Sequence, residues 1–291
     1  MKMRIHYLIL SLILFCNTLS GQQFIDLVKL EYRVSPNNEV LDSTNTGFNI
    51  AYADASALVP LKVDSVNYIL AGFAHSTLVL DGDVFQSNTL QIGWQHSWND
   101  AWKSTFLLLP KSSAKRGKLS QGDFQFGGLV IVSKTKSPTF QWKFGAYVNG
   151  DKFGPLTVPI FGFKWQASST FQIDATLPLG ATVRKTLNDR LHAGIVYSGR
   201  KYSYNANDAY LEVGENNVWG FADVYVTRSL VLNLRAGHSI LRDYQFFKKE
   251  DLVDVSFGSF ELGDNRSPLT GSLSQGYSFH AGLIWRINLD K

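Results

Sequence analysis

The histidines are the residues of this chain best suited to acid–base chemistry or metal binding, and there are six of them. His96 lies between Trp94 and Trp98, with all three on one side of a predicted strand. Together with a serine on the outer wall of a membrane protein, such a histidine could hydrolyse lipid. An amphipathic ring satisfied by water or headgroups among tryptophans produces the same pattern without catalysis, and we favour this simpler interpretation.

Other motifs of catalysis and metal binding are absent from the sequence. It contains no Gly-x-Ser-x-Gly, no His-Glu-x-x-His and no phosphate-binding glycine loop. Cys16 is the only cysteine, and it lies in an N-terminal apolar run. Four further histidines show no close spacing suited to a metal: His75, His192, His238 and His280. We therefore predict a protein that is not an enzyme and has no catalytic residue, cofactor or metal.

The N-terminal residues have the organisation of a secretory signal peptide. Lys2 and Arg4 precede the apolar run 7–16, and small residues follow it. A membrane-spanning helix needs roughly 18 or more apolar residues, so this run is too short to be one. We predict a cleaved signal peptide over 1–21 and a single exported domain over 22–291.

The composition of the exported part favours β structure. Removing residues 1–21 takes two of the 28 Lys and Arg and none of the 24 Asp and Glu, which leaves 26 against 24. This near-neutral balance gives no support for nucleic acid as a partner. The whole chain is 13% aromatic and only 18% charged, with 24 glycines, which is unlike a helix bundle. No later apolar run reaches about 18 residues, so membrane insertion would have to use strands.

Alternation of apolar and polar side chains is the dominant pattern. Over 277–289 the odd positions are apolar, as at Phe279 and Trp285, and the even positions include His280 and Arg286. A pleated strand places these two sets on opposite faces, whereas a helix does not. Together with the signal peptide, repeated segments of this kind predict an all-β fold, an antiparallel up-and-down transmembrane β-barrel.

The pattern predicts fourteen strands, an even number as in bacterial barrels of this kind. The least certain pair is 169–178 and 180–187, which could be one long strand, and a barrel of twelve strands is the main alternative. The predicted strands are 27–34, 46–61, 66–79, 88–98, 101–111, 122–133, 139–149, 156–167, 169–178, 180–187, 190–204, 216–227, 229–245 and 275–289.

The connections between these strands alternate between short turns and longer polar loops. We expect the longer ones at 35–45, 80–87, 111–121, 205–215 and 246–274. Such asymmetry is typical of outer-membrane barrels, which have short periplasmic turns. Six tryptophans lie near the short turns, as expected for a membrane-interface aromatic belt, and Trp219 lies towards the other rim. The six are Trp94, Trp98, Trp102, Trp142, Trp165 and Trp285.

Three segments resemble an uncharacterised family of Gram-negative outer-membrane β-barrel proteins, known as a domain of unknown function. They are Gly-Pro-Leu-Thr-Val-Pro-Ile-Phe-Gly-Phe-Lys-Trp over 154–165, Thr-Phe-Gln-Ile-Asp-Ala-Thr-Leu-Pro over 170–178, and Ala-Thr-Val-Arg-Lys-Thr-Leu-Asn over 181–188. The resemblance covers most of the exported chain as a strand pattern and is sharp over about 150–200. It implies a location in the outer membrane and brings no activity with it. One departure is the C-terminus, which runs past Leu289 to two charged residues where such barrels often end on an aromatic residue.

If the apolar faces contact lipid, the polar faces line the barrel interior. The charged and polar residues expected to face the lumen are Lys29, Glu31, Arg33, Lys143, Asp174, Arg190, His192, Arg235, His280 and Arg286. Their salt bridges could fill the interior, or they could line an open lumen whose basic excess favours anions. The last long loop, 246–274, could fold inward and narrow it.

These observations predict a non-enzymatic outer-membrane barrel with a small or gated pore, a transport role or a surface role. Its expected partners are outer-membrane lipids, the barrel-assembly machinery and small solutes. Two alternatives remain open: a lipid-modifying enzyme built on the same barrel, and a secreted soluble β protein that binds a ligand.

Overall fold

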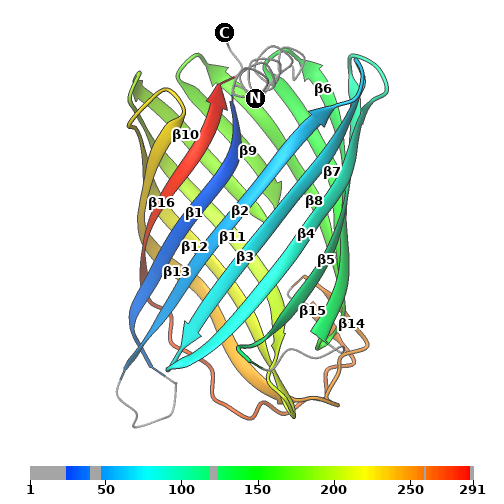
Figure 1. The fold of residues 1–291 in the computed structure, drawn as a ribbon, viewed down its shortest axis with the longest axis vertical. Coiled ribbons are helices and arrows are strands. Elements are labelled where there is room, and N and C mark those ends of the chain that lie inside the picture. The colour runs from blue at the N-terminus through cyan, green and yellow to red at the C-terminus, as the bar shows by residue number, and fades with distance from the viewer. Residues whose placement is uncertain (1–23, 40–46, 118–122, 259, 289–291) are drawn as a thin grey trace, which may run out of the picture.

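The computed structural model describes residues 24–39, 47–117, 123–258 and 260–288, and the predicted signal peptide 1–21 lies outside them. Fourteen of the strands form the barrel, and two short ones lie in a connection (Figure 1). No helix in these ranges is long and apolar enough to cross a membrane. The barrel strands are β1 (Phe24–Asn38), β2 (Phe48–Lys62), β3 (Asn67–Leu80), β4 (Asp83–Ser97), β5 (Trp102–Lys115), β6 (Phe124–Ser137), β7 (Phe140–Asp151), β8 (Gly154–Ser168), β9 (Phe171–Leu177), β10 (Gly180–Asn188), β11 (Leu191–Asn205), β12 (Ala209–Tyr225), β13 (Leu230–Lys248) and β16 (Tyr277–Asn288).

The strands form a closed ring. Each is antiparallel to its neighbours in sequence, and β1 also pairs with β16, which joins the two ends of the chain. Closure leaves no free sheet edge along the wall. The prediction of fourteen strands is confirmed, and the twelve-strand alternative is wrong because β9 and β10 are two strands joined by Pro178 and Leu179.

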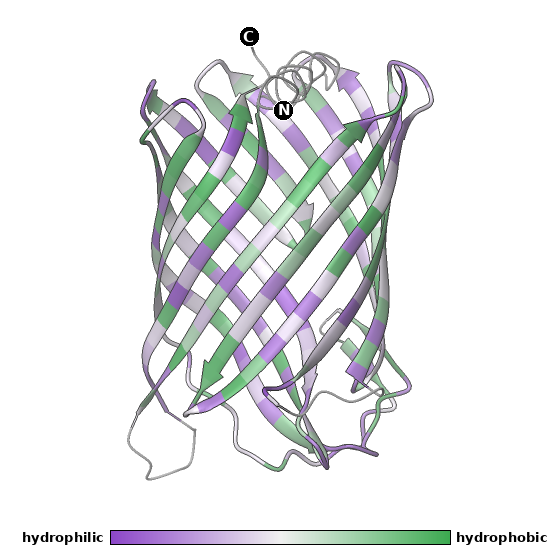
Figure 2. Ribbon diagram, in the orientation of Figure 1, coloured by the Kyte–Doolittle hydropathy of each residue, from purple (hydrophilic) through white to green (hydrophobic). Residues whose placement is uncertain are grey.

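Hydrophobic and hydrophilic residues alternate along many of the strands (Figure 2), and the pleat turns successive side chains to opposite faces of the wall. On β16, Phe279 and Trp285 are 50% and 59% exposed, whereas Ser278 and Arg286 are 0% and 1% exposed. The same alternation exposes Leu30 and Tyr32 on β1 and buries Arg33. A soluble protein would bury the apolar set, so this arrangement is inverted relative to a dry core.

The two ends of the barrel differ less in loop length than the sequence suggested. The start of β1, the end of β16 and the short turns that follow β2, β4, β6, β8, β10 and β12 lie at one end, here called the turn end (Figure 1). At the opposite end, the loop end, the loop expected at 80–87 is a two-residue turn. Asp81 and Gly82 there adopt positive φ angles of 47° and 81°, as in a tight hairpin. The loop expected at 205–215 shrinks to 206–208, because β12 already begins at Ala209. Strict alternation of short and long connections was therefore a wrong prediction.

The longest connection, residues 249–276, folds against the loop end and is here called the long loop. It contains β14 (Val255–Phe257) and β15 (Phe260–Leu262), which pair with each other (Figure 1). Two apolar clusters occupy the barrel beside it, and each includes one long-loop residue, Leu273 or Val253. The first cluster consists of Ile50, Tyr52, Leu78, Leu80, Phe85, Tyr204, Leu211, Val213, Tyr244 and Leu273. The second consists of Phe153, Leu156, Val158, Tyr210, Phe247 and Val253. The loop end is thus packed with side chains, and the polar space lies towards the turn end.

Candidate functional site

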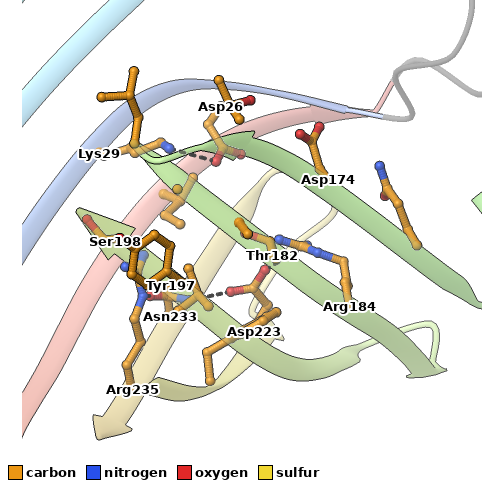
Figure 3. Close-up of a pocket in the computed structure, with 18 of the residues that line it drawn as sticks. Asp26, Lys29, Asp174, Thr182, Arg184, Tyr197, Ser198, Asp223, Asn233 and Arg235 are labelled. Atoms are coloured by element: carbon orange, nitrogen blue, oxygen red, sulfur yellow. Dashed lines mark hydrogen bonds and ion pairs between the residues drawn. The ribbon is translucent and has the colours of Figure 1, made fainter. Parts of the chain in front are cut away.

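A polar cavity of about 550 Å³ lies inside the barrel, from the turn end to mid-height (Figure 3). Its walls come from β1, β8 to β13 and β16, so strands distant in sequence meet around it. Six cationic side chains line it: Lys29, Lys164, Arg184, Arg200, Arg235 and Arg286. Four carboxylates line it: Asp26, Glu31, Asp174 and Asp223.

Arg286 is the centre of the ion network in this cavity. Its Nε donates to Asp26 at 2.6 Å and its Nη1 donates to Asp223 at 2.8 Å, and the guanidinium lies 4.0 Å from the centre of the Phe24 ring. Asp223 also accepts a 2.8 Å hydrogen bond from Arg184. Each carboxylate therefore has a cation in direct contact, as burial of charge requires.

A second group of ion pairs lies on the same wall. Arg235 donates to Glu31 at 3.2 Å, and His280 Nε2 is 3.4 Å from the same carboxylate. Across the cavity, Lys143 contacts Asp174 at 2.5 Å. These pairs join β1 to β13 and β16, and β7 to β9. They cross-link the interior and leave a small cationic excess.

A second cavity of about 460 Å³ lies further towards the loop end. Glu31, Leu179 and Arg200 line both cavities, so the two lie against each other. The second cavity has three cationic side chains, Lys111, Arg200 and Lys201, against the carboxylates of Glu31 and Asp54. It also has an apolar and aromatic wall formed by Ala55, Ala74, Leu109, Tyr147, Leu179, Tyr202 and Tyr204.

A buried ion pair separates these cavities from the first apolar cluster. Arg33 donates to Glu215 at 2.6 Å and lies 4.1 Å from the centre of the Tyr52 ring. Arg242 approaches the other oxygen of Glu215 at 3.7 Å. The Tyr52 hydroxyl is hydrogen-bonded to that of Tyr244 at 2.7 Å. Two arginines on one carboxylate satisfy its charge and fix the strands on which they lie.

Arg266 connects the long loop to the barrel wall. Its Nη1 donates to Glu212 at 2.6 Å and to the Tyr210 hydroxyl at 2.9 Å, and its Nη2 donates to Glu261 at 3.0 Å. Burial alone would lower the pKa of Arg266, but the hydrogen bonds to Asp264, Glu212 and Tyr210 raise it above its usual value. Hydrogen bonding from Arg266 lowers the pKa of Asp264 to about 2. Both groups therefore stay charged at neutral pH.

The structure brings most of the predicted lumen residues together. Lys29, Glu31, Asp174, Arg235 and Arg286 line the first cavity, and Lys143, His280 and Arg33 contact carboxylates inside the barrel. His192 lies at the turn end, with its ring 5.0 Å from that of Tyr225. Arg190 was wrongly predicted to face the lumen. It lies in the exposed turn between β10 and β11, where no strand pleat directs its side chain.

The six predicted belt tryptophans all lie in or next to the turn-end part of their strands. Five are exposed: Trp94, Trp98, Trp102, Trp165 and Trp285. Trp142 is half-buried and makes edge-on ring contacts with Phe140 and Phe163. Trp219 was misplaced at the opposite rim: it is 2% exposed, points inward and donates to Ser278 at 2.7 Å. Its indole N–H finds a buried partner there, which explains the inward position.

His96 lies against a belt tryptophan as expected, and the polar partner that the structure shows is a side chain, where water or headgroups were expected. Its Nδ1 is hydrogen-bonded to the Asn67 side chain at 2.8 Å, and its ring lies 4.5 Å from that of Trp98. Within the part of the chain that the structure describes, no group of three or more His, Cys, Asp and Glu side chains is placed to hold a metal.

Sequence reasoning missed several residues that hold the network together. The sequence could have indicated that Arg184 faces the lumen, because it shares a strand face with Thr182 and Thr186, opposite to Val183. Asp223 carried little, because its outward neighbours Ala222 and Val224 are small. Arg266 carried none, since it lies in a long connection without periodicity. The other two missed residues are Glu215 and Arg242.

Comparisons with known proteins concern the family and the barrel architecture. The family described as "Domain of unknown function (DUF6268)" matches residues 82–257, a range that includes the segment 154–188, so the resemblance to an uncharacterised family is confirmed. No curated protein sequence matches the chain.

Solved structures similar to this chain include three barrels. The CymD monoaromatic hydrocarbon channel is 9% identical, with 96% of this chain and 92% of that chain covered and a TM-score of 0.41. The toluene transporter TodX of P. putida is 10% identical, with 96% and 93% covered and a TM-score of 0.36. The NanC porin is 10% identical, with 89% and 100% covered and a TM-score of 0.36. Similarity at this level carries no argument about function.

Proposed function

The chain belongs to the DUF6268 family, a domain of unknown function, and we propose that it is an outer-membrane β-barrel whose interior is a narrow pore for small anions. The observation that carries this proposal is the inverted barrel, with apolar side chains outside, a basic cavity inside and a long loop packed over one end. The chain reaches the membrane by export with the signal peptide predicted over 1–21, and its turn end faces the periplasm.

The spacing of exposed aromatic residues supports a membrane-spanning position. On β16, Trp285 near the turn end and Tyr277 near the loop end are both exposed and eight residues apart. At roughly 3.3 Å per residue this is about 26 Å along the strand. A strand tilt of roughly 40° reduces it to about 20 Å along the barrel axis, close to the apolar band of about 25 Å in outer-membrane barrels. Phe124 and Phe126 extend the loop-end rim on β6.

The charges of the interior support a preference for anions. The two cavities together are lined by eight different cationic side chains and five carboxylates. Two of these cations are paired with carboxylates outside the linings, Lys111 with Asp151 and Lys201 with Glu212 and Glu261, so the cationic excess that faces the cavities is small. In a narrow lumen such an excess raises the local concentration of anions and lowers that of cations.

Conductance in planar bilayers tests the pore directly. Purified protein in a potassium chloride gradient should give channels of small conductance whose reversal potential indicates chloride selectivity. The double variant Arg235→Gln and Arg184→Gln should move the reversal potential towards zero, because it removes two cavity cations. Absence of channels from both the native chain and a chain without the long loop would refute the pore.

Substitution of an outward leucine by arginine tests the membrane position. Leu108 is 65% exposed and lies six residues from Trp102 on β5, or about 15 Å along the barrel axis at the usual rise and tilt. Leu108→Arg should cost about 2–4 kcal/mol of unfolding free energy in phospholipid liposomes, because a charge near the middle of the bilayer loses its hydration.

The matched control is Leu187→Arg. Leu187 is 55% exposed at the turn end of β10, where an arginine near the interface should cost less than about 1 kcal/mol. Urea titration of both variants in liposomes measures the difference. Equal stability of the two would argue for a surface that faces water.

A further inference from the structure

The barrel wall has a notch above the short hairpin of β9 and β10. Pairing of β8 with β9 runs from Ser168 only to Phe161, although β8 extends to Gly154. Pairing of β10 with β11 ends at Ser198, although β11 extends to Asn205. The loop-end parts of β8 and β11 therefore lack the neighbours that the rest of each strand has. Two strands of seven and nine residues cannot cover the height that strands of fifteen residues span.

β14 and β15 fill this notch. Ser256 and Phe257 of β14 pair with Leu156 and Thr157 of β8, in parallel. On the other side, Lys201 of β11 donates to Glu261 of β15 at 2.7 Å and to the Ser256 hydroxyl at 3.2 Å. The hairpin thus joins β8 to β11 at the height where β9 and β10 have ended.

The hairpin has the side-chain pattern of a wall strand. Phe257, Phe260 and Leu262 are 45%, 78% and 55% exposed, whereas Ser256 is fully buried and Glu261 turns towards Lys201. The barrel strands show the same alternation, with apolar side chains outside and polar side chains inside. A connecting segment has no need of this alternation unless its outer face contacts the lipid interface, as the barrel wall does.

Its attachment is much weaker than that of a wall strand. β14 shares two registered positions with β8, whereas β7 on the other side of β8 shares twelve. The remaining attachment comes from single contacts, such as Gly258 N–H to the Thr157 carbonyl at 3.1 Å, and from the ion pairs of Lys201 and Arg266. A segment with so few wall hydrogen bonds can separate without opening the ring, because the ring closes through β9 and β10.

The lumen cavities lie directly behind this segment. Lys201, which holds Glu261, lines the second cavity, and Leu179 at the tip of the short hairpin lines both cavities. The second cavity combines cationic side chains with an apolar wall that includes Leu109 and Tyr147. A solute with an anionic head and an apolar tail matches both surfaces.

We propose that β14 and β15 form a movable section of the barrel wall, and that amphipathic anions pass sideways through the notch between the lumen and the outer leaflet of the membrane. The route rests on the proposed pore function and adds to it a substrate class and an exit. The sulfonate or carboxylate head stays with the cavity cations, and the tail leaves along the apolar face of the hairpin. No covalent step is involved.

A reversible disulfide across the notch tests the route. Thr157→Cys and Phe257→Cys place two thiols on registered, outward positions of β8 and β14, in a chain whose only cysteine is replaced by Cys16→Ser. In proteoliposomes, oxidation should lower the flux of octanesulfonate at least tenfold, and a reductant should restore it. The flux of methanesulfonate, which has the same head without a tail, should stay within twofold, since it can follow the axis of the pore.

The matched control is a disulfide in the permanent wall. Val130→Cys and Ala146→Cys are registered partners on β6 and β7, and closing that bond should change neither flux. Octanesulfonate flux that is unchanged by the Thr157–Phe257 bond, while methanesulfonate still passes, would overturn the movable wall and leave the pore standing. If neither sulfonate passes in any variant, the pore itself fails.

A distance measurement gives a second test that needs no transport. Spin labels at Phe260→Cys on β15 and Ile195→Cys on β11 report the separation of the hairpin from the wall, and both positions are exposed. Octanesulfonate should add a second, longer distance to the distribution, and methanesulfonate should not. A single distance that octanesulfonate leaves unchanged would contradict the proposal.

Discussion

Replacing Arg266 with alanine should raise the open probability of the channel at least tenfold. The side chain is 3% exposed and connects the long loop to Glu212 and the Tyr210 hydroxyl on β12, and it also contacts Glu261 within the loop. Its removal deletes charge-assisted hydrogen bonds and leaves buried carboxylates with fewer cations, at a cost of about 2–4 kcal/mol to the packed state of the loop. Because about 1.4 kcal/mol corresponds to a factor of ten in a population, this loss shifts the loop substantially towards a displaced state.

Single-channel recording measures this effect, with Arg190→Ala as the control. Arg190 is an arginine in an exposed turn at the opposite end of the barrel, so its removal should leave the open probability unchanged. A second variant, in which a short Gly-Ser linker replaces residues 250–272, should show the larger conductance of an uncovered mouth. Equal open probabilities for Arg266→Ala and the native chain would show that the long loop does not close the pore.

Arg286→Met should destabilise the barrel by about 3 kcal/mol. The arginine is 1% exposed and contacts both Asp26 and Asp223, so its loss leaves a half-buried and a buried carboxylate without the charge that they share. Breaking a buried ion pair on one side typically costs about 3–5 kcal/mol. We expect the lower end of that range, because Lys29 still contacts Asp26 and Arg184 still contacts Asp223.

Neutralising Asp26, which has lost its arginine partner, should recover part of this loss of stability. The double variant Asp26→Asn and Arg286→Met should be more stable than Arg286→Met alone, whereas Asp26→Asn alone should be less stable than the native chain. Urea titration in liposomes gives the three free energies for this double-mutant cycle. A cost below about 1 kcal/mol for Arg286→Met would mean that water, and not Arg286, solvates the two carboxylates.

Alternation predicted the turn-end half of the barrel well, because there one face of each strand contacts the outside and the other a polar cavity. β16 is the clearest case, with Trp285 outside and Arg286 inside. The same reasoning separated β9 from β10, although a single long strand was also conceivable. Where the two faces of a strand contact very different surroundings, the alternation of apolar and polar residues can be recognised from a single sequence.

At the loop end the contrast disappears, and there the prediction was wrong. In β12, Tyr210, Leu211, Glu212 and Val213 are all buried, because the barrel interior covers one face and the long loop covers the other. Residues buried on both faces show no alternation, so this stretch was assigned to a loop. Phe85, assigned to the loop expected at 80–87, similarly lies on β4 and packs in the apolar cluster.

Both members of some ion pairs were predicted to face the lumen, as for Lys143 with Asp174, whereas other pairs were predicted on one side only. Asp223, the partner of Arg286, was missed, and the partners lie far apart in sequence: 63 residues for this pair and 204 for Glu31 and Arg235. Partner identity depends on the order and register of the ring, which one sequence does not reveal. The contribution of Arg266 depends in addition on how a connection without periodicity folds.

The pairing of β1 with β16 sets the order of events when the barrel assembles. Ten registered positions join the first strand to the last, from Phe24 opposite Asn288 to Val34 opposite Phe279. These contacts span nearly the whole sequence, so they cannot form until synthesis is complete, and contacts of such separation form slowly. Until then β1 and β13 each present an unpaired edge that can aggregate. Shielding of these edges until β16 pairs would therefore favour assembly, and a truncation that removes β16 should yield aggregate instead of a smaller barrel.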